Sequence, residues 1–150
     1  MIDYFSKEYN DSKRWMSYWY QIKEVLELNP KNVLIVGKGD GLVPAYLKMQ
    51  GLDVVTLDND KSLNPDIESS VLNIPLNDSS FDTILCAEVL EHLPYNEFNK
   101  ALSEIKKVAK IGAVISLPHF GPAIRFFLKI PFLPELKFVL KLPYPIKHKF

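Results

Sequence analysis

Four short runs of apolar and β-branched residues recur along this 150-residue chain. They are NVLIVG, DVVTLD, FDTILCAE and GAVISLP, which begin at residues 32, 53, 81 and 112. Continuous apolar runs of this length are typical of strands that helices cover on both faces of a parallel sheet. Helical patterns occupy residues 12–28, 42–51 and 97–112. The alternation therefore predicts an α/β fold: a doubly wound, mainly parallel Rossmann-like sheet with helices on both faces.

The segments around these runs carry more detailed expectations. In the first helix Trp15 and Trp19 fall roughly on the apolar stripe, so we expect both to dock the helix on the sheet. The last helix ends at Gly112, which suits the left-handed residue that stops a helix. Residues 59–80 are rich in turn formers, and they predict a loop with one short strand near Ser69–Leu72.

We expect a single domain made of an N-terminal helical segment (1–30), a nucleotide-binding core (31–118) and a proline-rich tail (119–150). The predicted strands number five, and the tail shows no hairpin signal. After His119 the tail has six basic residues and one acidic residue. It could cover the sheet edge, cap the substrate, pair with a second copy as a homodimer, or lie on an anionic membrane surface. Its prolines favour a core or cap role over peripheral membrane contact.

A glycine-rich loop joins the first predicted strand to the next helix. Gly37, Gly39 and Gly41 form the pattern G-x-G-x-G, and Leu42 stands where a dinucleotide fingerprint places its third glycine. A Gly-Lys-Ser/Thr triplet is absent, which argues against a triphosphate site. The second strand ends at Asp58, where a carboxylate can accept hydrogen bonds from two ribose hydroxyls. The pattern favours a ligand with a ribose and no cradled pyrophosphate over a tight turn that binds nothing.

Four stretches, in the same order, resemble the class I S-adenosylmethionine-dependent methyltransferases, in particular the small-domain group similar to methyltransferase type 11. They are VLIVGKGDG (33–41), VVTLDND (54–60), LNIPLNDSSFDTILCAEVLEHL (72–93) and ALSEIKKVAKIGAVISLP (101–118). The resemblance implies S-adenosylmethionine as cofactor and methyl transfer to a small-molecule or lipid-like acceptor. The family's sheet has seven strands and ends in an antiparallel hairpin. With five strands counted, we expect the last two to be missing, as in a fragment or a naturally short relative.

By position, the resemblance assigns each part of the cofactor to a segment of this chain. The glycine loop wraps the methionine part, the acid after the second strand holds the ribose hydroxyls, and the segment near residue 70 flanks the adenine. The cofactor-binding residues so implied are Gly37, Lys38, Gly39, Asp40, Gly41, Asp58, Asn59, Ser70, Val71, Leu72 and Glu88. The N-terminal aromatic residues could also form a lid over the ligand, as N-terminal helices do in similar proteins.

Two positions depart from the family's pattern. Many relatives have an acid near Ser70 that accepts from the adenine amino group, and serine can bond there only without charge assistance. The family usually has an acid at the position of Ile35, which helps to anchor the ligand's ammonium group. Losing a charge-assisted contact costs about 1.5–3 kcal/mol. Asp40 is a candidate to compensate, in which case Asp40→Asn would weaken cofactor binding.

Methyl transfer from a sulfonium needs mainly proximity and in-line geometry, so it requires no dedicated base. Glu91 and His92 follow the run that begins at residue 81, and they are candidates to take a proton from a hydroxyl or amine nucleophile. The alternative is a pair bonded to backbone at a helix terminus. We expect Asp82 and His119 to be structural. Three histidines and the single Cys86, without H-x-x-x-H or C-x-x-C spacing, predict no metal site.

Composition limits the partners and the location. Eighteen basic residues balance eighteen acidic ones, and no Asn/Asp-Pro-Pro-Tyr/Phe motif is present, so we expect no nucleic-acid partner. A single cysteine, a polar N-terminus and the lack of an apolar run near the ~20 residues of a transmembrane helix fit a cytoplasmic protein. Two alternatives to an active methyltransferase stay open: a catalytically weak or inactive scaffold or regulatory relative, and an NAD-dependent oxidoreductase, against which Leu42 argues.

Overall fold

Five parallel strands form the central sheet, in the order β3-β2-β1-β4-β5. The computed structural model describes residue 6, residues 11–117 and the backbone of residues 123–128 and 136–141. The chain divides into two compact units, Met1–Leu117 and Pro118–Phe150, and the sheet belongs to the first. Its elements are α1 (Ser12–Glu27), β1 (Asn32–Val36), α2 (Leu42–Met49), β2 (Asp53–Asp58), η1 (Lys61–Leu63), β3 (Ile67–Glu68), β4 (Phe81–Ala87), η2 (Leu90–His92), η3 (Tyr95–Glu97), α3 (Phe98–Val108) and β5 (Ala109–Ser116).

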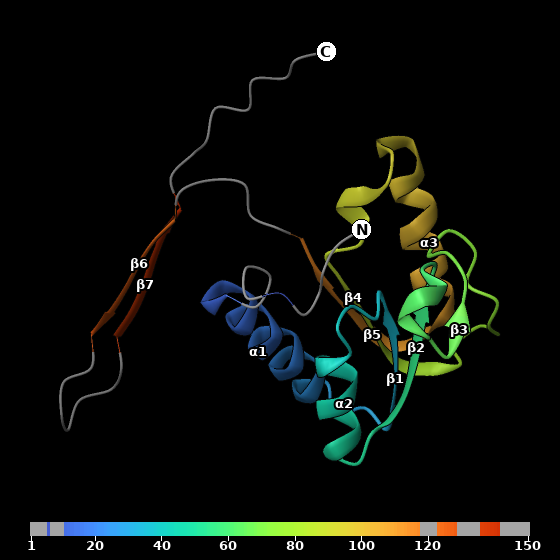
Figure 1. Ribbon diagram of the computed structural model, residues 1–150, viewed down its shortest axis with the longest axis horizontal. Coiled ribbons are helices and arrows are strands. Elements are labelled where there is room, and N and C mark those ends of the chain that lie inside the picture. Colours follow the sequence, from blue (N-terminus) through green and yellow to red (C-terminus); the bar gives the residue numbers. More distant parts are fainter. Residues whose placement is uncertain (1–5, 7–10, 118–122, 129–135, 142–150) are drawn as a thin grey trace. The chain divides into compact units, whose positions relative to one another are not determined.

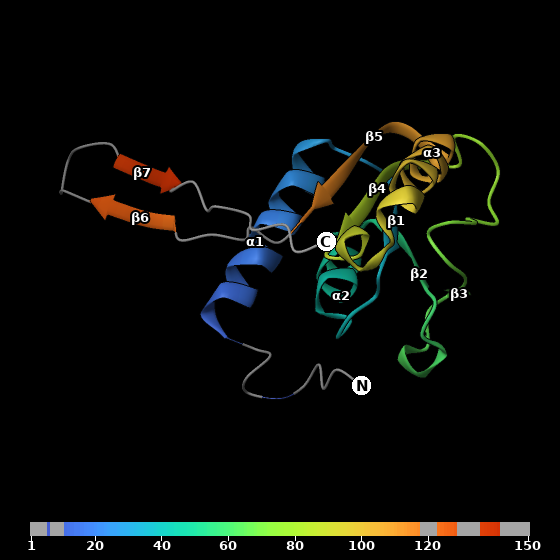
Figure 2. The same ribbon diagram turned by 90° about the horizontal axis from the view of Figure 1, so that it is seen from above.

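Helices cover both faces of this sheet. Leu34 and Val36 of β1 join a core cluster with the buried residues of α3, whereas Val33 and Ile35 join a second cluster with residues of α1 and α2. Figure 1 and Figure 2 show α1 and α2 on one side of the strands and α3 on the other. Because β1 is covered on both faces, its sequence is continuously apolar. The predicted doubly wound α/β fold is confirmed.

The strand order reverses beside β1. The chain passes from β1 to β2 and β3 on one side, and then returns to place β4 and β5 on the other. In open parallel sheets a reversal of this kind leaves a crevice outside the carboxyl ends of the strands, where ligands bind. The topology thus fixes where a functional site would lie.

Helix α1 docks on the sheet through a different stripe from the one expected. Trp15 and Trp19 are 53% and 50% exposed, so the prediction that they dock the helix is wrong. The buried residues of α1 are Tyr18, Gln21 and Val25. A stripe that includes a buried glutamine cannot be found from apolar periodicity alone, because the polar residue interrupts the pattern.

Two element boundaries also differ from the prediction. The short strand β3 lies at Ile67–Glu68 rather than near Ser69–Leu72, where a turn begins: the hydroxyl of Ser70 accepts the N–H of Leu72 at 3.2 Å. The last helix ends at Val108 instead of Gly112, which lies inside β5. The residues from Ala109 to Gly112 pair with the start of β4 as part of β5, so the helix ends before them.

The second unit contains an antiparallel pair of strands, β6 (Ala123–Leu128) and β7 (Leu136–Lys141). The expectation of no hairpin in the tail is therefore wrong. Residues 129–135 separate the two strands, so the two-residue turn motif that marks a tight hairpin is missing. Within the described residues this pair forms its own two-stranded sheet. The predictions for His119 and for the prolines and basic side chains of the tail lie outside the side chains that the structure describes.

In the part of the chain that the structure describes, every helix is too short or too polar to cross a membrane.

At the end of the sheet away from the crevice, Asp82 connects the starts of three strands. Its carboxylate accepts the N–H of Lys31 at 2.8 Å, just before β1, and lies 3.7 Å from Nζ of Lys110 in β5. Its own N–H donates to Oδ1 of Asn32 at 2.6 Å. The bond from the Lys31 backbone is the main cause that lowers the pKa of Asp82 below its ordinary value. Asp82 therefore acts as a structural residue at this end of the fold.

We predict that Asp82→Asn lowers the melting temperature at pH 7 and makes the melting temperature less sensitive to acidic pH. Because the folded-state pKa of Asp82 is lowered, the stability from its carboxylate is complete above the unfolded-state pKa, about 3.9, and is lost as the pH falls through the folded-state pKa. Melting temperatures measured from pH 7 down to pH 2 should converge for variant and wild type. Asp53→Asn, at the exposed start of β2, is the control. A constant gap between D82N and wild type across this range would contradict the prediction.

Candidate functional site

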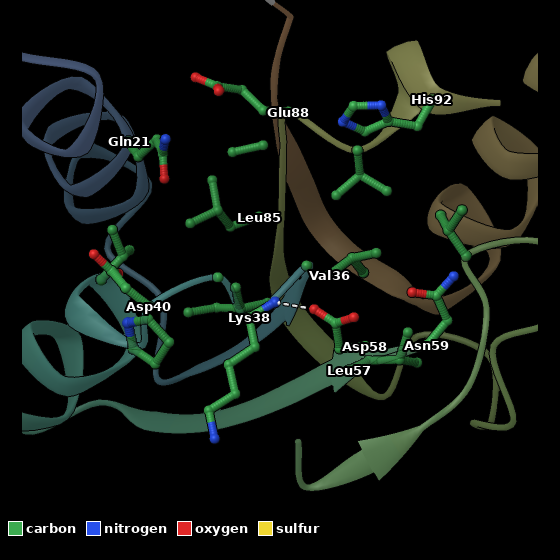
Figure 3. Close-up of a pocket in the computed structure, with 18 of the residues that line it drawn as sticks. Gln21, Val36, Lys38, Asp40, Leu57, Asp58, Asn59, Leu85, Glu88 and His92 are labelled. Carbon is green, nitrogen blue, oxygen red and sulfur yellow. Dashed lines mark hydrogen bonds between the residues drawn. The ribbon is translucent and has the colours of Figure 1, made fainter. Parts of the chain in front are cut away.

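A cavity of about 460 Å³ opens at the carboxyl ends of β1, β2 and β4 (Figure 3). It occupies the crevice at which the strand order reverses, and its volume falls within the roughly 300–1,000 Å³ of typical small-molecule sites. Its walls come from the loops after these three strands, from the segment after β3, and from α1 and α2.

The loop after β1 approaches the segment after β4 because Gly37 has no side chain. A Cβ built on Gly37 would lie 2.5 Å from Cγ2 of Val89, and the φ of Gly37 is +88°. The Gly37 N–H donates to the carbonyl of Leu57 at 2.8 Å, which ties the loop to β2. A Cβ on Gly39, whose φ is +56°, would meet no atom within 4 Å. Gly37 is therefore the glycine that close packing requires.

The backbone of this loop orients Asp58 at the end of β2. The carboxylate accepts the N–H of Lys38 at 2.7 Å on Oδ2 and the N–H of Asp60 at 2.9 Å on Oδ1, and Figure 3 shows the first of these bonds. A carboxylate has about four acceptor sites. Each oxygen of Asp58 can thus accept one more hydrogen bond from a ligand hydroxyl in the cavity, and Asn59 lines the wall beside it.

The cavity brings together most of the cofactor-binding residues predicted from the sequence. Gly41 and Leu72 are not part of its wall: Gly41 caps the start of α2 with a φ of +82°, and Leu72 packs against the core cluster on the α3 side. The predicted residues that do line the cavity are Gly37, Lys38, Gly39, Asp40, Asp58, Asn59, Ser70, Val71 and Glu88.

Ile35 contributes an apolar side chain to the wall and is 2% exposed. The residue expected to compensate for it, Asp40, lines the cavity with both carboxylate oxygens already bonded. Oδ1 accepts the N–H of Leu42 at 3.0 Å, near the start of α2, and Oδ2 accepts the hydroxyl of Tyr18 at 2.8 Å. The second bond connects the glycine loop to α1. Compensation by Asp40 stays a prediction.

A charged cluster joins α1 to the end of β4. The guanidinium of Arg14 donates to Oε2 of Glu88 at 2.5 Å, and the hydroxyl of Ser17 donates to Oε1 of Glu88 at 3.1 Å. Gln21 in turn donates from Nε2 to the Ser17 hydroxyl at 3.1 Å. Glu88 has a φ of +55°, a left-handed conformation that is uncommon outside glycine. Arg14, Tyr18, Gln21 and Glu88 all line the cavity.

Arg14 and Gln21 line the cavity although the sequence did not predict them there. Ser17 and Gln21 are four residues apart, on the same face of α1 as the buried Tyr18 and Val25. Two polar residues at this spacing, within a stripe that docks a helix, could have indicated a polar cavity under α1.

The structure separates the two candidate catalytic residues. His92 lines the cavity, whereas Glu91 is not part of its wall. Both belong to the short helix η2, and one carboxylate oxygen of Glu91, Oε2, is buried without a hydrogen-bond partner among the described residues. Burial, with a smaller effect from Glu91, raises the pKa of Cys86 to about 12. The thiol is therefore protonated at neutral pH and is no nucleophile.

The described residues contain no group of three or more His, Cys, Asp or Glu side chains that could hold a metal ion. What the cavity offers is a backbone loop with a carboxylate at one end and a charged cluster at the other, with His92 on its wall. This arrangement can hold a polar, extended ligand and position it for reaction.

Comparison with known proteins assigns a family to this fold. A family model described as a methyltransferase domain matches residues 34–117, more than half of the chain. A curated relative, an uncharacterised protein of Methanocaldococcus jannaschii, is 32% identical over 89 residues, which make up 55% of this chain. The match spans only 38% of that relative's length.

Solved structures show the same fold. A SAM-dependent methyltransferase from Aquifex aeolicus is 26% identical, with a TM-score of 0.57 over 89% of this chain and 79% of that one. The 1,6-didemethyltoxoflavin-N1-methyltransferase of Burkholderia thailandensis, solved with 1,6-didemethyltoxoflavin and S-adenosylhomocysteine, is 18% identical. Its TM-score is 0.56 over 78% of this chain and 56% of that one.

We predict that Gly37→Ala destabilises the protein more than Gly39→Ala does. Both residues have positive φ, which costs an L-residue about 1–2 kcal/mol. Only Gly37 adds a collision with Val89, for which we expect a further loss of about 1–3 kcal/mol in the free energy of unfolding measured in urea.

A Val89→Ala background supplies the control for this comparison. Removing the Cγ atoms of Val89 should recover most of the extra loss at Gly37 and leave the cost at Gly39 unchanged, as a double-mutant cycle would show. Equal losses for the two glycine variants in both backgrounds would mean that close packing at Gly37 is unimportant.

Proposed function

Because this chain belongs to the methyltransferase-domain family, we propose that it transfers the methyl group of S-adenosylmethionine to a small-molecule or lipid-like acceptor. The cofactor is S-adenosylmethionine, as in the SAM-dependent relative from Aquifex aeolicus. The observation that carries the proposal is Asp58, whose carboxylate is fixed by the glycine loop at the cavity and keeps acceptor sites for two hydroxyl groups.

The residues present fit this cofactor. Close packing at Gly37 leaves loop backbone in the cavity wall, where it can approach a ligand closely. In the proposed complex Asp58 and Asn59 hold the ribose, Ser70 and Val71 flank the adenine, and the loop from Gly37 to Asp40 lies along the methionine part. These assignments follow the order in which the segments line the cavity from β3 to β4.

S-adenosylmethionine supplies an electrophilic methyl group on its sulfonium. The chain's own contribution is to hold the acceptor in line with that group and to exclude water. His92 lines the cavity after β4, and we assign it the role of taking a proton from a hydroxyl or amine acceptor. Glu91 lies off the wall and receives no such role.

We predict that S-adenosylhomocysteine binds to the purified full chain and that Asp58→Ala weakens this binding. Loss of hydrogen bonds to a charged acceptor costs about 1.5–3 kcal/mol, which corresponds to roughly tenfold to 150-fold in dissociation constant. Titration calorimetry with S-adenosylhomocysteine measures the change directly.

Asp53→Ala is the matched control for that experiment, because Asp53 begins the same strand that Asp58 ends and lies away from the cavity. Its affinity should equal that of the wild type. If the folded wild type fails to bind at millimolar ligand, the proposal is wrong, and the non-catalytic scaffold favoured by Ile35 takes its place. Binding that Asp58→Ala leaves intact would place the ligand elsewhere.

A further inference from the structure

The outward face of α1 carries large apolar side chains that are exposed in the part of the chain that the structure describes. They stand at positions i, i+1, i+4 and i+5 of the helix, and residues at these spacings form one continuous surface. The helix is already docked by Tyr18, Gln21 and Val25, which point inward. We call the exposed set, whose members are 36–53% exposed, the outer patch: Trp15, Met16, Trp19 and Tyr20.

Two edge-to-face ring contacts order the outer patch. The ring centroids of Trp19 and Tyr20 are 4.8 Å apart, and those of Trp15 and Tyr18 are 6.2 Å apart. Trp, Tyr and Met are enriched at protein–protein interfaces, and Trp and Tyr often carry most of the binding energy. Rings that are held in place before contact also lose less conformational freedom on binding. The outer patch therefore has the composition and the order of a protein interface.

The charges of α1 favour a protein partner over a membrane. Residues 11–27 contain three basic and three acidic side chains, whereas a helix that lies on an anionic membrane is rich in lysine and arginine. Near the end of α1, Lys23 pairs with Glu24 at 3.0 Å and with Glu27 at 2.9 Å, which leaves one negative charge in excess there. Lys13 is exposed near the start, where Asp11 caps the helix. The outer patch thus lies between an exposed cation and an acidic cluster.

The outer patch is self-complementary about a two-fold axis. Its four residues are centred along the helix between Ser17 and Tyr18, so an axis at that level brings each end of the patch against the opposite end of a second copy. Lys13 and Glu24 are eleven residues apart, about three turns, so they lie on the same edge of the helix, on either side of this centre. In an antiparallel pair of helices the same axis places Lys13 of one copy near Glu24 of the other.

We propose that this chain forms a homodimer through α1, in which the outer patch packs against the same patch of a second copy and Lys13 pairs with Glu24 across the interface. With ordinary side-chain areas, the exposed parts of the patch amount to roughly 400 Å² per copy, about half of what each partner buries in a standard interface. This area suffices for the apolar centre of a reversible dimer with charged pairs at its rim. The interface does not depend on which ligand the cavity binds.

Sedimentation equilibrium of the full-length chain, at micromolar to submillimolar concentrations, tests the proposal. We expect a reversible equilibrium between monomer and dimer for the wild type. Trp19→Ala and Tyr20→Ala should each raise the dissociation constant at least about thirtyfold, because each removes an aromatic ring from both halves of the interface. Tyr95→Ala is the matched control, since it removes a tyrosine that is 94% exposed in η3, directly before α3. It should leave the dissociation constant unchanged.

Charge reversal distinguishes a second copy from any other occupant. Lys13→Glu alone and Glu24→Lys alone each place like charges across the two-fold axis, and each should weaken self-association about tenfold. An equimolar mixture of the two variants should associate as tightly as the wild type, because the mixed dimer again has opposite charges at both contacts.

Four results overturn this inference. They are a wild type that stays monomeric, a dimer that survives both aromatic substitutions, a mixture of the charge-reversal variants that associates no better than either alone, and an equal loss in Tyr95→Ala. A monomer that binds phosphatidylserine vesicles through Trp19 would assign the outer patch to a membrane instead. None of these results bears on the proposed function, because no ligand is added. Melting curves identify a variant that does not fold, and if Trp19→Ala is one, the mixture of charge-reversal variants decides.

Discussion

The close approach at Gly37 is the constraint on which the site depends. The segment that leaves β4 can pass the end of β1 only because Gly37 has no Cβ, and Val89 occupies the space that a side chain would need. With the loop held there, its next N–H bonds to Asp58, and the loop then turns through Gly41 into α2. One missing side chain thus determines both the shape of the cavity and the orientation of its carboxylate.

The sequence was sufficient to predict the sheet, because its buried strands are largely apolar, β-branched runs of the kind typical of a parallel sheet covered on both faces. It was also sufficient to place the glycine loop and Asp58 at the same edge of the sheet, because topology brings the ends of β1 and β2 together, and their role in binding stays a prediction. It did not predict the pairing of β6 with β7, because the segment between them lacks the two-residue turn motif of a tight hairpin. It also placed the end of α3 too late, because the residues after Val108 suit a helix but pair with β4 instead.

Helix α1 shows why the residues that it contributes to the cavity wall were not predicted from the sequence. A helix that only covers a sheet needs an apolar stripe, and the search for one selected the tryptophans. In the structure α1 also forms a wall of the cavity, so its inner face mixes Val25 and Tyr18 with Ser17 and Gln21. Polar residues on a docking face are the expected sign of a helix that borders a binding site, since each must find a hydrogen-bond partner there.

Because α1 forms one wall of the cavity, binding of a ligand at that wall and docking of α1 are coupled. An acid at position 35 would be held by the sheet itself, which forms a core independent of α1 on its other face. Arg14 and Tyr18 line the cavity only when α1 is docked, and the hydroxyl of Tyr18 and the side chain of Ser17 connect that docking to Asp40 and Glu88. A ligand that contacts this wall of the cavity therefore stabilises the docked helix, and by linkage a change that loosens α1 weakens the binding of that ligand.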